Sequence, residues 1–251
     1  MIISDPKARR ERAEQKRTAL LRFLREELYT TPGMAGLVMG CGERAARQTI
    51  ASMESEGVIK RHPVALAEGQ RPVMIIGITG HGQGIAFGEG ETVRAREFRL
   101  CDFSMLHLQH TTDIQRLRVA SSDITGKWVP GGLLPKSKKG VKRPDAIAVL
   151  HDGARVAIEV ERSIKNPMRY REILAGHLLA IKQKNWDRVV WTSPSKEISG
   201  RVERIIKSIN RLKIGGIDTL LTPSDFAHLS FCEYKRFRET LVGEVGEDGN
   251  A

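Results

Sequence analysis

The sequence predicts an α/β protein with two domains, and three observations lead to this expectation. The first part of the chain favours helices joined by a glycine-rich connection. Apolar strand-like segments alternate with helical segments from about residue 102 onward, which is typical of a mixed sheet flanked by helices. A polar stretch separates these parts, and 251 residues suffice for two hydrophobic cores. We expect a first domain at 1–90, a linker at 91–100, a second domain at 101–225, and a C-terminal helix with a disordered tail at 226–251.

The first domain should begin with a helix from Asp5 to Leu28, because leucines recur on one stripe of that segment. A short apolar turn at Met34 to Met39 and the glycines around Cys41 lead to another helix. Its inward positions are Ala46, Ile50 and Met53. A short helix, a glycine turn and a second helix occur in this order in the helix-turn-helix motif.

A two-stranded hairpin is expected after the second helix. Gly57 should end that helix in a left-handed conformation, and extended segments at 58–62 and 73–78 flank a polar turn at 68–72. Thr79 should start a further helix. The whole pattern predicts a winged helix-turn-helix domain, with DNA contacts from Arg44, Arg47, Gln48 and, at the hairpin tip, Arg71. The alternative is a helical packing domain whose arginines form a solvated face.

Charge and composition narrow the class of partner. The net charge of +11 and the pI near 9.8 favour a polyanion, with nucleic acid preferred to an acidic membrane surface. The sequence has no apolar run of membrane-spanning length and no apolar signal-peptide core at its start, so we expect a cytoplasmic protein. Its three cysteines lie far apart and indicate neither a disulfide framework nor a zinc site.

The second domain should open with a helix from Asp102 to about Val119. One stripe of it carries Leu106, His110, Ile114 and Leu117, so His110 is expected inside as a core histidine rather than as a ligand; His107 and Asp113 are weaker candidates. Trp128 should lie in a strand. Further on we expect helices at 167–184 and 197–212, strands at 186–193 and 217–221, and a helix from Ser224 to Leu241. A basic run between these parts is expected to hold nucleic-acid phosphates through Lys136, Lys138, Lys139, Lys142 and Arg143.

The segment from Arg143 to Tyr170 contains most of the predicted chemistry. Pro144-Asp145 opens one apolar strand, and a second strand from Arg155 to Glu161 ends in Glu-Val-Glu. Because strand side chains alternate, Glu159 and Glu161 should share a face. Closely spaced carboxylates in an apolar strand repel one another and are costly to desolvate, so they call for a cation. Mg²⁺ or another hard metal would suit the three acids. The alternative is a solvated edge strand.

These residues resemble the PD-(D/E)xK nuclease superfamily, in which the Pro-Asp acid and the first acid of the next strand hold a metal and a lysine follows. Asp145 and Glu159 match this pattern, Glu161 stands at the lysine position, and Lys165 is the nearest lysine. With the helix-turn-helix order before them, RPDA (143–146), VAIEVERSIK (156–165) and RYREIL (169–174) resemble the replication-relaxation family and its MobC-type plasmid mobilisation relaxases.

The resemblance implies a restriction-endonuclease-like second domain that nicks one DNA strand at a transfer origin, with Mg²⁺ or Mn²⁺. Asp145, Glu159 and Glu161 would be metal ligands, with Glu161 alternatively the base orienting a nucleophile, and Lys165 would stabilise the phosphate. Tyr170 is either a covalent nucleophile or a packing residue. Expected partners are the transfer-origin duplex, its nicked strand and a conjugation coupling protein. The alternative function is a regulator that binds DNA through the first domain without cutting it.

Overall fold

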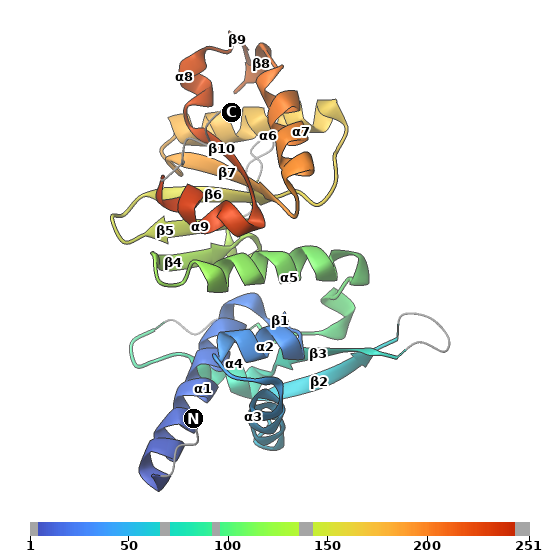
Figure 1. The fold of residues 1–251 in the computed structure, drawn as a ribbon, viewed down its shortest axis with the longest axis vertical. Coiled ribbons are helices and arrows are strands. Elements are labelled where there is room, and N and C mark those ends of the chain that lie inside the picture. Colours follow the sequence, from blue (N-terminus) through green and yellow to red (C-terminus); the bar gives the residue numbers. More distant parts are fainter. Residues whose placement is uncertain (1–4, 66–70, 92–95, 136–142, 244–251) are drawn as a thin grey trace, which may run out of the picture. The chain divides into compact units, whose positions relative to one another are not determined.

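The computed structural model describes residues 5–65, 71–91, 96–135 and 143–243. The chain is a mixed α/β protein, as predicted, and it divides into two compact units, Met1–Thr112 and Asp113–Ala251 (Figure 1). The division falls within one helix, α5 (Met105–Ala120), whereas the expected linker at 91–100 lies within the first unit.

The first unit contains helices and a small antiparallel sheet with the strand order β1-β3-β2. Its elements before α5 are α1 (Pro6–Glu27), β1 (Tyr29–Thr30), α2 (Pro32–Val38), α3 (Glu43–Ser55), β2 (Ile59–Val64), β3 (Val73–Ile78), α4 (Gly80–Ala86) and the short 3-10 helix η1 (Leu100–Asp102).

Local chemistry sets the helix boundaries of this unit. The Asp5 side chain accepts hydrogen bonds from the N–H groups of Lys7 and Ala8 at the start of α1. Thr79 caps α4 in the same way by accepting the Gly82 N–H at 3.0 Å, as the sequence predicted. Gly57 ends α3 with a φ of +72°, in the left-handed region that glycine adopts without strain.

The predicted inward stripe of α3 is confirmed, because Ala46, Ile50 and Met53 are all buried. One prediction for this unit was wrong. The segment 34–39 belongs largely to α2, a helix that Pro32 and the Thr31 cap initiate, and not to a turn. The expected two-stranded hairpin is confirmed as the antiparallel pair β2-β3, and a third strand, β1, whose two residues pair with β3, enlarges the sheet. Strand β1 has only two residues, which are too few to show the alternation of apolar and polar residues that predicts a strand.

The second unit is built on a five-stranded sheet with the order β10-β7-β6-β5-β4. Strands β6, β7 and β10 run parallel, and β5 is antiparallel to both of its neighbours. Its elements after α5 are β4 (Thr125–Pro130), η2 (Gly131–Leu133), β5 (Ala146–Leu150), β6 (Arg155–Val160), α6 (Pro167–Lys182), β7 (Arg188–Ser193), α7 (Lys196–Lys207), β8 (Arg211–Ile214), β9 (Ile217–Leu220), α8 (Pro223–Phe226), β10 (Leu229–Glu233), η3 (Tyr234–Arg236) and α9 (Phe237–Val242).

Each face of this sheet has its own apolar cluster. Ala157 of β6 and Trp191 of β7 pack with α6, α7 and the β8-β9 hairpin on one face. The other cluster combines the end of α5 with α9 and with Val156, Ile158 and Val160 of β6. These three β6 residues therefore share one face of the sheet, and Ala157 belongs to the opposite face.

Two predicted C-terminal helices were wrong. The helix expected at 197–212 ends at Lys207, and β8 follows it. The segment 224–241 is not one helix, because β10 occupies its middle and pairs in parallel with β7. Tertiary pairing overrides the helical composition of this segment. The tail from 244 onward lies outside the described residues.

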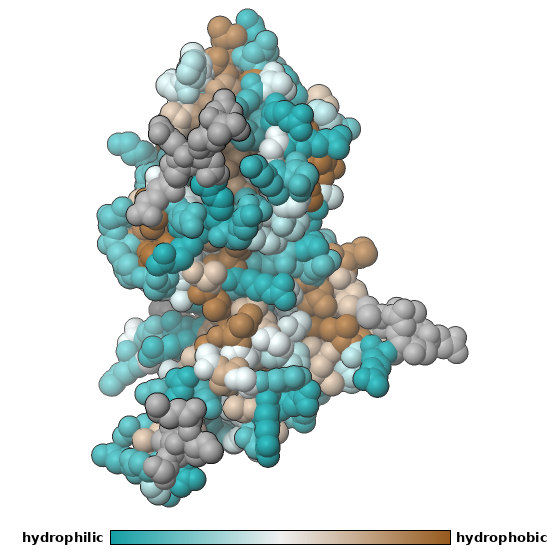
Figure 2. All heavy atoms as spheres, in the orientation of Figure 1, coloured by the Kyte–Doolittle hydropathy of each residue, from teal (hydrophilic) through white to brown (hydrophobic). Residues whose placement is uncertain are grey.

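The predicted inward stripe of α5 is only partly correct. Ile114 and Leu117 are buried, His110 is half-buried, and Leu106 is 92% exposed. Hydrophilic residues cover most of the visible face of both units, with scattered apolar patches (Figure 2). Within the described ranges, no helix combines the length and the apolar character needed to cross a membrane.

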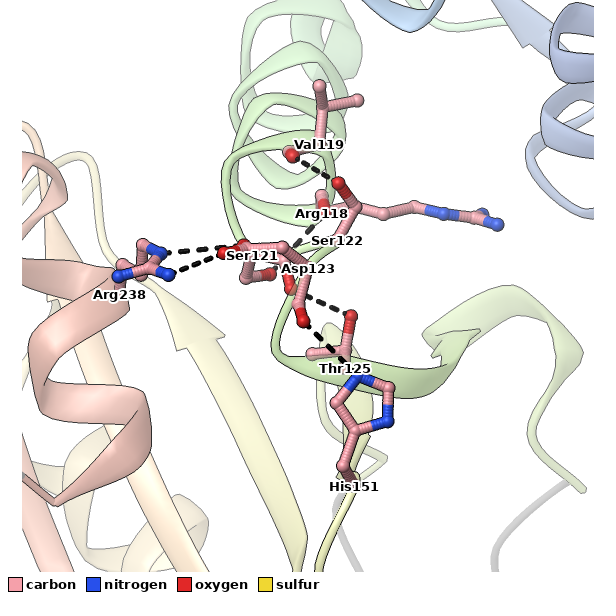
Figure 3. A network of polar contacts seen from close by, with 8 residues as sticks. All are labelled: Arg118, Val119, Ser121, Ser122, Asp123, Thr125, His151 and Arg238. Atoms are coloured by element: carbon pink, nitrogen blue, oxygen red, sulfur yellow. Dashed lines mark hydrogen bonds and ion pairs between the residues drawn. The ribbon is translucent and has the colours of Figure 1, made fainter.

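A polar network connects α9 and the β5–β6 turn at one end of the sheet in the second unit (Figure 3). Arg238 of α9 forms an ion pair with Asp123, and His151, at the β5–β6 turn, contacts the Asp123 carbonyl at 3.2 Å. Hydrogen bonding from Arg238 lowers the pKa of Asp123. Strand β5 starts at the opposite end of the sheet from His151. This network therefore has a structural role and does not involve the start of β5.

Candidate functional site: a carboxylate group at the end of β6

The predicted acids lie where β6 ends and β5 begins. Glu159 and Glu161 are 0% and 1% exposed, respectively, and Asp145 is half-buried. Oxygen Oδ2 of Asp145 accepts the N–H of Val160 at 2.8 Å, which places its carboxyl group beside the backbone between the two glutamates. The structure therefore brings the two strand ends together as the sequence predicted. We call Asp145, Glu159, Glu161 and the nearby Lys165 the acid cluster.

The start of β5 is fixed by backbone contacts. The Gly131 N–H donates to the carbonyl of Asp145 at 2.8 Å. A Cβ atom on Gly131 would overlap the carbonyl of Pro144, so only glycine permits this close approach. At Gly132 a Cβ would meet nothing within 4 Å. The end of β4 thus holds Asp145 in position through a residue without a side chain.

Lys165 lies on the loop after β6, and its side chain contacts an acid of the cluster. Its Nζ lies 2.6 Å from Oε1 of Glu161, and the lysine side chain is 39% exposed while that of Glu161 is 1% exposed. A buried carboxylate needs such a charged hydrogen-bond donor. The ammonium group expected near the acids is therefore present, although it comes from four residues beyond Glu161.

Glu159 contacts a residue that the sequence reasoning missed. Oε1 of Glu159 lies 2.9 Å from Nε2 of His177 on α6, and both side chains are 0% exposed. Two tryptophan rings, Trp186 and Trp191, contact the histidine edge-on at centroid distances of 5.4 and 5.2 Å. The sequence signal was available, since His177 follows Ile173 and Leu174 on the buried stripe of α6.

Tyr170 lies beside the acid cluster but is fully buried. Its hydroxyl accepts the N–H of Lys165 at 3.2 Å, so it holds the loop that carries the lysine. The start of α6 is set by Asn166, whose side chain accepts the Met168 N–H at 2.9 Å. This environment supports a packing role for Tyr170.

A second ionic group anchors the loop after β6. Arg162 forms an ion pair with the buried Asp113, and the Tyr234 hydroxyl donates to the same carboxylate at 3.0 Å. Burial raises the pKa of Tyr234, and the negative charge of Asp113 raises it further. Because Arg162 directly follows Glu161, this anchor limits where the second glutamate of the acid cluster can move. The contacts of Asp113 with Arg162 and Tyr234 therefore have a structural role.

The donor atoms of the acid cluster suit a hard cation in type but do not form a closed cage. Across the described parts of the chain, no group of three or more His, Cys, Asp or Glu side chains is arranged to hold a metal ion. Mg²⁺ commonly uses only one or two protein carboxylates and completes its shell with water and substrate phosphate. Asp145 and Glu159 offer carboxylate oxygens, the type of donor that such an open site uses.

The predicted DNA contacts of the first unit are on the surface. Arg44, Arg47 and Gln48 are exposed on α3, and Arg71 is exposed before β3. Arg47 forms an ion pair with Glu43 on the same helix. A groove of about 430 Å³ between α1 and α3 has a mixed lining. It combines the basic Arg10, Lys16 and Arg17 with the acidic Glu14, with polar residues such as Gln48 and Ser52, and with apolar residues such as Met53.

Most of the predicted phosphate-binding run falls outside the part of the chain that the structure describes. Lys136, Lys138, Lys139 and Lys142 lie outside the described residues. Arg143 is described and exposed, two residues before Asp145. Of the two other histidines considered, His107 is exposed and His110 is half-buried.

The structure thus defines a mixed α/β protein with a largely buried carboxylate group at one end of its larger sheet. Comparison with protein-family models, with curated proteins and with solved structures gives no match. The functional conclusion therefore rests on this chain's own residues.

Proposed function

We propose that this protein is a metal-dependent endonuclease that nicks DNA, of the relaxase kind that acts at a transfer origin. In this proposal the first unit is a winged-helix DNA-binding domain and the second is a restriction-endonuclease-like domain. The order of α1, α2, α3 and the β2-β3 hairpin supports the first assignment. The mixed sheet with helices on both faces supports the second.

The observation that carries the proposal is the position of Lys165. Glu161 occupies the position where the nuclease pattern has a lysine, yet Lys165 Nζ lies 2.6 Å from the Glu161 carboxylate. The acid cluster therefore combines two carboxylates for a cation with an ammonium group for a phosphate oxygen. A bound cation and an ammonium group together can stabilise the negative charge that develops on a phosphate during cleavage.

The residues then have separate roles. Asp145 and Glu159 would hold Mg²⁺ or Mn²⁺. A bound metal of this kind lowers the pKa of a coordinated water and neutralises charge on the scissile phosphate. Glu161 orients Lys165, and Lys165 moves its ammonium group to the phosphate when DNA enters. The Tyr170 hydroxyl is buried and accepts the Lys165 N–H, so we assign the attack to water and not to a tyrosine.

A nicking assay tests this function. Purified protein is incubated with supercoiled plasmid carrying its mobilisation region and Mg²⁺ or Mn²⁺. Asp145→Asn keeps an oxygen to accept the Val160 N–H but removes the charge, so nicking should fall by at least about 100-fold while the protein stays folded. Glu159→Gln should have a similar effect.

Asp187→Asn is the matched control for that assay. Asp187 accepts the Arg155 N–H at 2.7 Å at the other end of β6, so the substitution has the same chemistry away from the acid cluster. It should leave nicking unchanged. Full nicking activity in Asp145→Asn and Glu159→Gln would show that the acid cluster is not the cutting site.

A second function is favoured by a specific observation. Glu159 is paired with His177 and Glu161 with Lys165, and the described residues form no three-ligand metal group. A DNA-binding regulator with a nuclease-like domain that does not cut fits these pairings. It predicts duplex binding by the purified protein and no metal-dependent nicking by the parent chain.

A further inference from the structure

The buried pair of Glu159 and His177 joins a residue of the sequence motifs to one that they do not include. Both side chains are 0% exposed, and their contact measures 2.9 Å. An ionised carboxylate only accepts hydrogen bonds, so with Glu159 ionised the Nε2 atom of His177 carries the hydrogen. Removing that donor would leave a buried charge without one of its partners.

The surroundings of His177 leave its ring little freedom. Trp186 and Trp191 contact the ring edge-on, and Trp191 is itself stacked on Phe231 with a centroid distance of 5.5 Å. Such edge-on contacts define an orientation as well as a distance. The Nδ1 atom is buried and has no hydrogen-bond partner among the described residues, so Nε2 is the atom that carries the polar function of the ring.

We propose that His177 is a positioning residue for Glu159, which it holds in the orientation that binds the divalent cation. This inference rests on the proposed function, because it gives the metal ligand Glu159 a partner of its own. Ligating carboxylates are commonly hydrogen-bonded in this way, and losing such a partner typically reduces metal affinity about 10–100-fold. A histidine that only fills the core would leave metal affinity unchanged.

Two amide substitutions separate these roles. His177→Gln places an amide nitrogen near the position of Nε2, so it can still donate to Glu159. His177→Asn has the same chemistry but ends near the position of Nδ1, which is too short to reach. Binding of Mn²⁺ alone to the full chain is followed by the electron paramagnetic resonance signal of the free ion, and thermal unfolding is measured in parallel.

We expect His177→Gln to bind Mn²⁺ about as well as the parent and His177→Asn to bind about 10–100-fold more weakly. His177→Phe, which preserves the ring contacts without a donor, should behave like His177→Asn. Nicking of plasmid DNA should follow the same order among the three variants.

Parental Mn²⁺ affinity in folded His177→Asn and His177→Phe would overturn the positioning role and leave the nicking function standing. Loss of folding in all three variants would also overturn it, since His177 would then serve the core. A parent chain that binds Mn²⁺ but does not nick DNA would contradict the proposed function alone. A parent that does neither would contradict both.

Discussion

At the scale of single residues, the acid cluster shows which chemistry a sequence can reveal. Asp145, Glu159 and Glu161 stood out because carboxylates interrupt apolar strands, and the structure places them together. His177 did not stand out, because a histidine on the buried stripe of a helix looks like an ordinary core residue. Its role depends on contact with Glu159, 18 positions earlier. A contact between residues this far apart in the sequence produces no periodic pattern from which it could be predicted.

The Asp113 carboxylate should contribute measurably to stability. It is 5% exposed and is bonded by Arg162 and Tyr234, so Asp113→Ala should lower the free energy of unfolding by about 1.5–3 kcal/mol. Urea unfolding followed by circular dichroism measures this. Glu172→Ala removes an exposed partner of Arg169 and should change stability by less than about 0.5 kcal/mol. Equal effects of the two substitutions would contradict this assignment.

At the scale of elements, the strand pair β5-β6 was predictable and β10 was not. The first consists of two apolar runs joined by a glycine turn, whereas Leu229 to Glu233 mixes apolar and polar residues and is followed by basic residues typical of a helix. β10 is a strand because β7 offers it a parallel partner. The pairing partner, and not local propensity, decides the structure of such a segment.

The element that positions Asp145 can be tested with two neighbouring glycines. Gly131→Ala forces a Cβ against the Pro144 carbonyl and should shift the start of β5. We expect a loss of about 1–3 kcal/mol in stability. Metal-dependent nicking should also decrease because Asp145 moves. Gly132→Ala meets open space and should leave both properties near the parental values. The measurements are urea unfolding and the plasmid assay, and matching results for the two variants would contradict the close-approach argument.

At the scale of the whole molecule, composition predicted a basic α/β protein, and the two compact units divide at a different place from the polar stretch. The expected boundary at 91–100 follows a change to polar residues, whereas the structural division falls between Thr112 and Asp113, inside α5. A continuous helix has no glycine or proline at such a point. Its sequence therefore gives no sign of the division.

The net charge of +11 leads to a prediction about salt. If α3 contacts duplex phosphates, Arg44→Ala should weaken binding and reduce the slope of log affinity against log salt by about 1. Fluorescence anisotropy with a labelled duplex at several salt concentrations measures the slope. Lys182→Ala removes an exposed charge at the last turn of α6 and should leave the slope unchanged. Equal slopes for Arg44→Ala and the parent would remove α3 from the DNA interface.

The late position of β10 in the chain has a consequence for synthesis. β7 has β6 on one side and β10 on the other, and β10 begins 36 positions after β7 ends. Until the ribosome has released Leu229 to Glu233, the apolar strand 188–193 has an open edge that can pair with another chain. A product that stops at residue 225, where the sequence first placed the end of the domain, would keep that edge permanently and would be prone to aggregate.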